Sequence, residues 1–159
     1  MNGIAFNHQK CTGCALCSLA CSTRFDVQGF NLRKSAIRVR VVGLMKADVP
    51  VACMQCEDAP CAAACPEGAF YWVEATGALA IDGEKCSNCG NCIPACPYGV
   101  IYLHQDRVLP IKCDLCEGSP ICVTYCVPGA ISLAPAASWP RARRDEYFQV
   151  LSKTGGAGR

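Results

Sequence analysis

The sequence has no apolar run close to the roughly 20 residues that a membrane-spanning helix needs, so we expect no direct membrane insertion. Only ten residues precede the first cysteine, and they contain neither an apolar segment nor a small-residue cleavage site. No twin-arginine signal stands there either, because the pair Arg143 and Arg144 lies near the other end. We therefore expect a cytoplasmic protein, with export on a partner's signal as the open alternative.

The residue types and motifs that enzymes commonly use are also scarce. There are two histidines, His8 and His104, and neither a glycine-rich nucleotide loop nor a nucleophile paired with a general base is visible. The sequence therefore favours a protein that is not an enzyme by itself. Nucleic-acid binding is not expected, since the short arginine cluster at 141–144 is followed by Asp145 and Glu146.

Cysteine is the residue that the sequence has in excess, with 16 among 159 residues. In a reducing compartment, clustered cysteines bind metal more often than they form disulfides. Cysteine also inflates the hydrophobic content of 52%, so the apolar core is modest for a chain of this length. We expect bound metal to supply much of the folding free energy.

The cysteines fall into four copies of one pattern, in which a fourth cysteine follows a triplet after three intervening residues. The second and third cysteines are separated by two, four, two and five residues in turn. Copies 1 to 4 are Cys11, Cys14, Cys17, Cys21; Cys53, Cys56, Cys61, Cys65; Cys86, Cys89, Cys92, Cys96; and Cys113, Cys116, Cys122, Cys126. No cysteine is left over, and copies 2 and 3 continue with Pro66 and Pro97.

This spacing matches the bacterial ferredoxin run that holds 4Fe-4S clusters. A short loop can wrap three corners of such a cluster, while the fourth corner points away from the loop. In two-cluster ferredoxins the fourth cysteine of each run binds the other cluster, and the three-residue gap allows a helical turn to carry it there. We expect four 4Fe-4S clusters as cofactors. Structural zinc, which takes two separated Cys-x-x-Cys pairs, and a disulfide framework are the weaker alternatives.

Strand-like segments alternate with the cysteine runs. Residues 69–73 and 78–82 flank a turn that ends in Gly77 and predict a hairpin. Further strands are expected at 37–42, 100–104, 107–111 and 131–133. Copies 2, 3 and 4 each lead into a glycine and then an apolar run. The repeated unit predicts an α+β fold of two pseudo-symmetric bacterial ferredoxin-like halves, with short strands and short helices around two 4Fe-4S clusters each.

The sequence resembles the four-cluster iron-sulfur subunits of the dimethyl sulfoxide reductase type, which accompany molybdenum and tungsten pterin enzymes and some hydrogenases. The likeness covers about residues 4 to 134 and is carried by KCTGCALCSLAC, CMQCEDAPCAAACPEGAF, KCSNCGNCIPACPYGVI and KCDLCEGSPICVTYCVPGAI. The order of the four spacings matches as well as their number. One departure is Val127, which stands where the family often has proline, with Pro128 one residue later.

The resemblance implies that copy 1 pairs with copy 4 and copy 2 with copy 3. Four ligand sets follow, each with three cysteines from one copy and one from its partner. Set A is Cys11, Cys14, Cys17 and Cys126; set B is Cys113, Cys116, Cys122 and Cys21; set C is Cys53, Cys56, Cys61 and Cys96; set D is Cys86, Cys89, Cys92 and Cys65. One half then comprises 1–52 with 106–137, the other comprises 53–105, and 138–159 is a C-terminal tail with a short helix expected over 141–152.

The resemblance implies an electron-transfer subunit that relays single electrons between a catalytic oxidoreductase subunit and a flavin subunit or other acceptor. The preferred catalytic partner is a tungsten- or molybdenum-pterin enzyme of the aldehyde oxidoreductase type. A hydrogenase, formate dehydrogenase or carbon monoxide dehydrogenase partner, or a free-standing polyferredoxin, is the alternative.

Two segments outside the cysteine runs are candidates for contacts with partners. Residues 22–49 hold six basic residues against two acidic ones, which suits either a docking face for an acidic partner or a solvated loop and strand edge. The tail packs on its own domain or on a partner. A subunit with two different ends could also stack head to tail into filaments through these segments.

Overall fold

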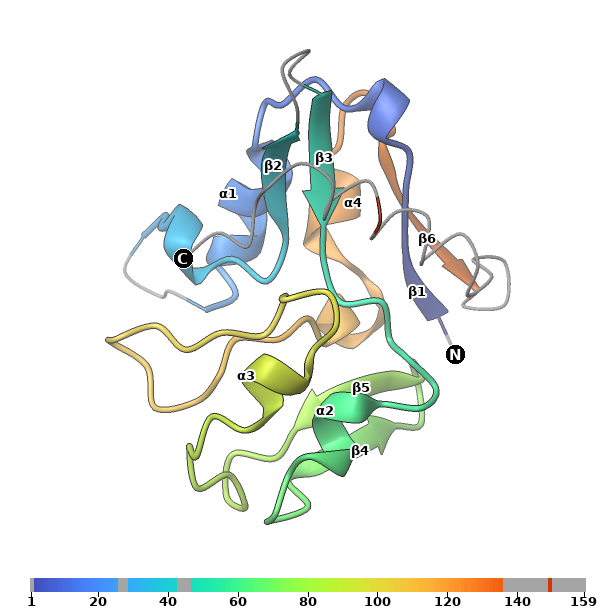
Figure 1. The fold of residues 1–159 in the computed structure, drawn as a ribbon. Coiled ribbons are helices and arrows are strands. Elements are labelled where there is room, and N and C mark those ends of the chain that lie inside the picture. Colours follow the sequence, from blue (N-terminus) through green and yellow to red (C-terminus); the bar gives the residue numbers. More distant parts are fainter. Residues whose placement is uncertain (1, 26–28, 43–46, 136–148, 150–159) are drawn as a thin grey trace.

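The computed structural model describes residues 2–25, 29–42, 47–135 and 149 (Figure 1). Within these residues the strands form three separate two-stranded antiparallel sheets, and four short α-helices carry parts of the cysteine runs. No helix in the described part of the chain is long and apolar enough to cross a membrane. Apart from residue 149, the tail helix expected over 141–152 lies outside the described residues.

The first sheet joins the N-terminal segment to the segment that follows copy 4. Strand β1 (Asn2–Phe6) pairs with β6 (Ile131–Pro135), and Phe6 lies opposite Ile131. Ile4 and Phe6 alternate with less buried residues along β1, as expected for a strand with one face on the core. The strand predicted at 131–133 is confirmed, while β1 has no counterpart among the predicted strands.

The second sheet is a hairpin of β2 (Arg38–Val42) and β3 (Ala47–Val51), with Arg38 opposite Val51. It confirms the strand predicted at 37–42. Strand β3 was not predicted, and it contains Pro50, which usually counts against a strand. A two-stranded sheet leaves each strand one edge without a ladder, where a residue that lacks an N–H is tolerated.

The third sheet confirms the hairpin predicted around residues 69–82. Strands β4 (Phe70–Val73) and β5 (Ala78–Ile81) pair, and the amide of Gly77 donates to the carbonyl of Val73 at 2.7 Å to close the turn.

The strands predicted at 100–104 and 107–111 are wrong. In their place the two segments form one isolated antiparallel bridge, between Tyr102 and Ile111. A turn begins directly after Leu103, because Arg107 N–H donates to the carbonyl of His104 at 2.9 Å. Pro110 also has no N–H to offer a ladder.

Short helices occupy the gap between the third and fourth cysteine of every copy, as the spacing predicted. They are α1 (Leu16–Ser22), α2 (Pro60–Ala63), α3 (Cys92–Ala95) and α4 (Ile121–Thr124). Three 3-10 helices accompany them: η1 (His8–Lys10), η2 (Leu32–Lys34) and η3 (Leu115–Gly118). Helix α1 contacts α4, and α2 contacts α3, which supports the expected pairing of copies.

The packing is continuous between the two predicted halves. Figure 1 shows the sheets β1–β6 and β2–β3 gathered with α1 and α4, while α2, α3, β4 and β5 lie together below them. The larger core centres on Ile37, Ile111 and Leu115, and it also includes Ala78 and Val100 from the predicted second half. The division into 1–52 with 106–137 and 53–105 therefore describes two parts that share a core, and it remains a proposal.

Candidate metal centres

Every copy of the cysteine run bends at the residue that precedes its second cysteine. Gly13, Gln55, Asn88 and Leu115 have φ values of 69°, 49°, 57° and 60°, all in the left-handed region. For residues such as Gln55 and Leu115 this conformation costs roughly 1–2 kcal/mol, so the surrounding structure must impose it, whereas asparagine adopts it more readily. Turns of this kind direct successive N–H groups into a concavity that favours an anion. Sequence reasoning missed this feature, since only one of the four residues is glycine.

A second repeated turn follows the fourth cysteine of copies 2, 3 and 4. Gly68, Gly99 and Gly129 have φ values of 56°, 58° and 63°, and each donates its N–H to the carbonyl of that fourth cysteine. The next amide then faces the sulfur: Ala69 N–H lies 3.4 Å from Cys65 Sγ, and Ala130 N–H lies 3.2 Å from Cys126 Sγ.

The turn after copy 4 is kept even though Val127 replaces the usual proline. Its hydrogen bond from Gly129 to Cys126 measures 3.0 Å, against 3.3 Å for the matching bond in copy 2. Val127 is 87% exposed, so its side chain does not have to be accommodated in the core. The substitution therefore leaves the backbone around Cys126 intact.

All sixteen cysteines are free thiols in the structure, and none forms a disulfide. Their exposure differs by position in the runs. The buried ones are Cys17, Cys21, Cys53, Cys61, Cys92, Cys113 and Cys122; the half-buried ones are Cys11, Cys56, Cys65, Cys86, Cys96, Cys116 and Cys126. Only Cys14 and Cys89 are exposed.

Copies 1 and 4 lie against each other through α1 and α4, which supports an exchange of their fourth cysteines. Burial raises the pKa of Cys17 to about 11, and the charges of Cys11 and Cys126 contribute to that rise. Burial and then the charge of Cys21 raise the pKa of Cys122 to about 12. Because charges act strongly on a thiol only at short range, these effects support a place for Cys126 beside copy 1 and for Cys21 beside copy 4.

The contact between α2 and α3 supports the same exchange between copies 2 and 3. Burial raises the pKa of Cys61 to about 11, against the opposing charge of Lys112 and with a contribution from Cys96. The pKa of Cys92 is raised by burial and then by charges that include that of Cys65. These placements support sets A to D, and the assignment of one cluster to each set is a proposal.

Charge effects and packing between neighbouring copies favour the order A, B, C, D for the four sets. Cys17 of set A contributes to the raised pKa of Cys122 of set B. Cys53 of set C is the largest charge contribution, after burial, to the raised pKa of Cys113 of set B. Cys61 of set C and Cys92 of set D belong to one small core cluster. The two exposed cysteines, Cys14 and Cys89, therefore fall in the two terminal sets.

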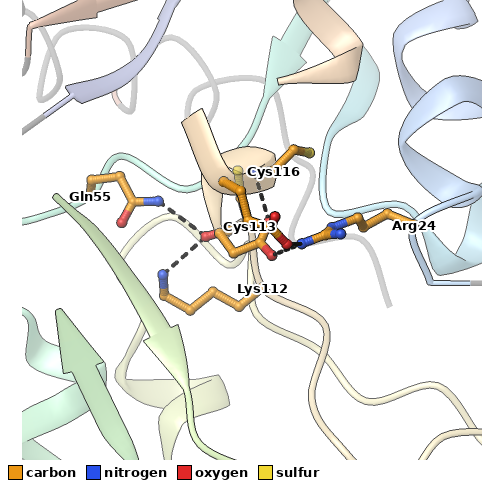
Figure 2. A network of polar contacts seen from close by, with 7 residues as sticks. Arg24, Gln55, Lys112, Cys113 and Cys116 are labelled. Carbon is orange, nitrogen blue, oxygen red and sulfur yellow. Dashed lines mark hydrogen bonds and ion pairs between the residues drawn. The ribbon is translucent and has the colours of Figure 1, made fainter. Parts of the chain in front are cut away.

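Polar side chains fix the loop of copy 4 from two directions (Figure 2). On one side, Asp114 accepts from the amide of Cys116 at 2.9 Å, and Arg24 donates to Asp114 and Glu117 at 3.0 and 2.9 Å. These carboxylates raise the pKa of Arg24. On the other side, Gln55 and Lys112 both donate to the carbonyl of Cys113.

Much of the basic segment 22–49 is engaged within the protein. Arg24 pairs with two carboxylates, as above, and Lys34 lies 3.6 Å from Asp106. Arg38 stacks on the ring of Tyr102 with its guanidinium carbon 3.7 Å from the ring centroid. Arg33, Arg40 and Asp48 lie in the described part of this segment, and Lys46 and Asp26 lie outside it. These contacts favour a structural role for Arg24, Lys34 and Arg38 over a free docking face.

The donor chemistry fits iron-sulfur clusters better than single ions. In the described part of the chain no three Cys, His, Asp or Glu side chains surround one point closely enough to hold a metal ion. The four ligands of a cubane bind four different irons, so they stand further apart than the ligands of one zinc ion. Amides directed at Cys65 and Cys126 supply the hydrogen bonds that an anionic cluster accepts.

Comparisons with known families and curated proteins agree with this chemistry. A family described as 4Fe-4S dicluster domain matches residues 45–135, and a second family of the same description matches residues 3–71. The "Aliphatic sulfonate oxidoreductase, polyferredoxin-like subunit" of Pyrococcus furiosus is 40% identical over 124 residues, which cover 77% of this chain and 70% of that protein. The "Thiosulfate reductase electron transfer subunit PhsB" of Salmonella typhi is 33% identical over 141 residues, covering 79% and 71%.

A solved structure shares the fold. A chain of the active site complex BamBC of benzoyl coenzyme A reductase, solved in complex with zinc, superposes with a TM-score of 0.51. The match covers 99% of this chain and 93% of that one at 24% identity. At this identity the likeness concerns the arrangement of the backbone alone.

Proposed function

Because the chain belongs to the 4Fe-4S dicluster family, we propose that it holds four 4Fe-4S clusters, one in each of sets A to D, and serves as an electron-transfer subunit of an oxidoreductase complex. When bound, each cluster accepts and releases one electron at a time. The thiolates of the sixteen cysteines hold the clusters, and the buried residues around sets B and C keep water away from the middle of the series.

The exposure of Cys14 and Cys89 is the observation that carries this proposal. Both belong to terminal sets, A and D, while the cysteines of sets B and C are all buried or half-buried. Electrons can therefore be exchanged with partners at two separate places, and the inner clusters connect them. An isolated metal-storage or structural protein has no need for such an arrangement.

The role we propose is not catalytic. Sets A to D use all sixteen thiols, so each cluster receives four protein ligands and no iron is left open to a substrate. The two relatives named above bear names of electron-transfer or polyferredoxin-like subunits, which supports the same role.

For the catalytic partner we propose a tungsten- or molybdenum-pterin oxidoreductase of the aldehyde oxidoreductase type, with a flavin subunit or another carrier as the acceptor. The names of the relatives support an oxidoreductase partner, and they refer to aliphatic sulfonate and thiosulfate chemistry. The relatives' names do not mention a pterin metal or an aldehyde substrate. This part of the proposal is therefore based only on the resemblance of the cysteine runs to the dimethyl sulfoxide reductase type.

The test is an anaerobic affinity purification of the protein from its native cell, with iron, sulfide, tungsten, molybdenum and nickel measured in the recovered complex. Tungsten or molybdenum in a large co-purifying subunit is the expected result. Nickel in the co-purifying subunit would indicate that the partner is a hydrogenase or carbon monoxide dehydrogenase instead of a pterin enzyme. About sixteen irons per chain without any partner would leave a free-standing polyferredoxin.

Head-to-tail stacking of this subunit is a separate part of the proposal. The exposed ligands at two different ends make such a contact heterologous, and a heterologous contact that does not close gives filaments. Sedimentation at high concentration should then show a series of species. A single monomer or closed complex at all concentrations would contradict stacking and leave the electron-transfer role untouched.

A further inference from the structure

Lys112 places a positive charge inside the protein without an acidic partner. Its residue is 5% exposed, and its ammonium donates to the carbonyls of Leu79 and of Cys113, the latter at 3.2 Å. Among the described residues no carboxylate forms an ion pair with it. Carbonyl dipoles alone offset only part of the cost of burying a charge, so the ammonium needs an anion nearby.

Gln55 fixes the position of this charge. It is fully buried, donates to the same Cys113 carbonyl at 3.1 Å, and accepts from the amide of Leu79 at 3.0 Å. Gln55 and Lys112 thus bind the N–H and the carbonyl of Leu79, respectively. Both also donate to one oxygen of Cys113 (Figure 2). The Lys112 side chain therefore has a fixed geometry rather than the freedom of a surface lysine.

The ammonium lies on the side of set C, because it binds the carbonyl of Leu79, and Leu79 packs with Cys61 in one core cluster. Its charge is the largest influence that opposes the burial-driven rise in the pKa of Cys61. The charge therefore lies beside set C, and its contact with Cys113 of set B is with the backbone carbonyl.

We propose that Lys112 is a positioning residue that raises the reduction potential of the cluster held by Cys53, Cys56, Cys61 and Cys96. The inference rests on the proposed function, since it requires the cluster to be bound. Reduction adds a negative charge to an anionic group, and a fixed positive charge nearby stabilises the reduced form more than the oxidised form. The buried setting strengthens this effect, because water and salt screen it little.

The chain supplies a matched control. A lysine immediately precedes the first cysteine of three copies, at Lys10, Lys85 and Lys112. The Lys85 side chain is 64% exposed and lies 3.6 Å from Asp82, so solvent and a carboxylate already compensate its charge. Lys85→Met removes the same charge at the same position of the motif, without removing a buried ammonium.

The experiment is a redox titration of the anaerobically purified holoprotein, followed by electron paramagnetic resonance, after iron per chain has been counted. In Lys112→Met one midpoint potential should fall, and the moving signal should be the one that Cys56→Ser alters. Lys112→Arg keeps the charge and should restore most of the shift. Lys85→Met should leave that potential close to the wild-type value.

Two results would overturn the inference. One is a Lys112→Met or Lys112→Gln protein with its full iron content and an unchanged set of potentials. The other is loss of one cluster from both neutral variants while Lys112→Arg keeps it, which would assign Lys112 a purely structural role. A wild-type protein that lacks four reducible clusters would instead contradict the proposed function itself, so the two failures are distinguishable.

Discussion

The side-chain amide of Gln55 donates a hydrogen bond of 3.1 Å to the carbonyl oxygen of Cys113, across 58 residues of sequence. Gln55 lies between the first two cysteines of copy 2, and Cys113 is the first cysteine of copy 4. The bond therefore ties set C to set B at the junction of the two predicted halves. It helps to explain why the larger core runs through both halves rather than stopping between them.

Gln55→Leu should make the holoprotein less stable. The change leaves the buried amide of Leu79 without an acceptor and removes one donor from Cys113, and each unsatisfied buried group costs about 1–3 kcal/mol. The temperature at which the clusters are lost should fall. Gln9→Leu is the control, since Gln9 is exposed and its side chain makes none of these contacts. Equal temperatures for both variants would contradict the bridging role of Gln55.

Gly13→Ala should weaken set A. Gly13 has φ +69°, and a Cβ there would overlap the carboxylate of Asp48. Since Gln55, Asn88 and Leu115 adopt the same conformation at the matching position, we expect a loss of only about 1 kcal/mol from the backbone. Iron release to a chelator from the cluster of set A should be faster.

Gly3→Ala is the comparison for that variant. A Cβ at Gly3 meets nothing within 4 Å, and its φ is not in the left-handed region. This substitution should be neutral or stabilise the protein by about 0.5 kcal/mol, because alanine has fewer unfolded conformations than glycine. Faster iron release from Gly3→Ala than from Gly13→Ala would contradict the account of the copy 1 loop.

Cys21→Ser should alter the cluster of set B, although Cys21 lies next to set A in the sequence. Its charge contributes to the raised pKa of Cys113, Cys116 and Cys122, behind burial in each case. Electron paramagnetic resonance should show a change in one cluster. Cys14→Ser, which removes a ligand from set A, should change a different one. If both variants changed the same signal, the exchange of fourth cysteines between copies 1 and 4 would be wrong.

Asp114→Ala should destabilise the copy 4 loop more than Glu117→Ala does. Asp114 binds both Arg24 and the amide of Cys116, whereas the Glu117 side chain is 81% exposed and binds Arg24 alone. We expect about 1–2 kcal/mol for Asp114→Ala, and about 0.5 kcal/mol or less for the exposed pair. Thermal loss of the set B cluster measures both effects. The reverse order would show that the contact with the Cys116 amide contributes little.

The parts of the fold that sequence reasoning predicted have local causes. Gly77 closes the hairpin of β4 and β5, and the three-residue gaps hold one short helix each, because their spacing alone constrains the backbone. Strand β3 was missed because Pro50 counts against a strand, although an edge position tolerates it. The strands at 100–104 and 107–111 failed because the apolar pattern did not reveal the turn after Leu103.

The features of the site that were missed depend on tertiary contacts. Gln55 and Leu115 rarely adopt a left-handed conformation, and only Gly13 and Asn88 are residue types that do so readily, so the shared loop geometry was not visible in the sequence. Lys85 and Lys112 occupy the same place in the motif, and only burial against Leu79 and Cys113 distinguishes them. The sixteen cysteines that we propose as ligands, by contrast, were all visible, since their spacing is a property of the chain alone.

The most direct test of the central claim is the number of electrons that the anaerobically purified chain accepts in a coulometric reductive titration. Four one-electron clusters in sets A to D predict an uptake of about four electrons per chain, in more than one step because the four environments differ. An uptake of two electrons or fewer by a chain with all its metal bound would contradict a four-cluster relay. No uptake at all would show that the bound metal is redox-inert.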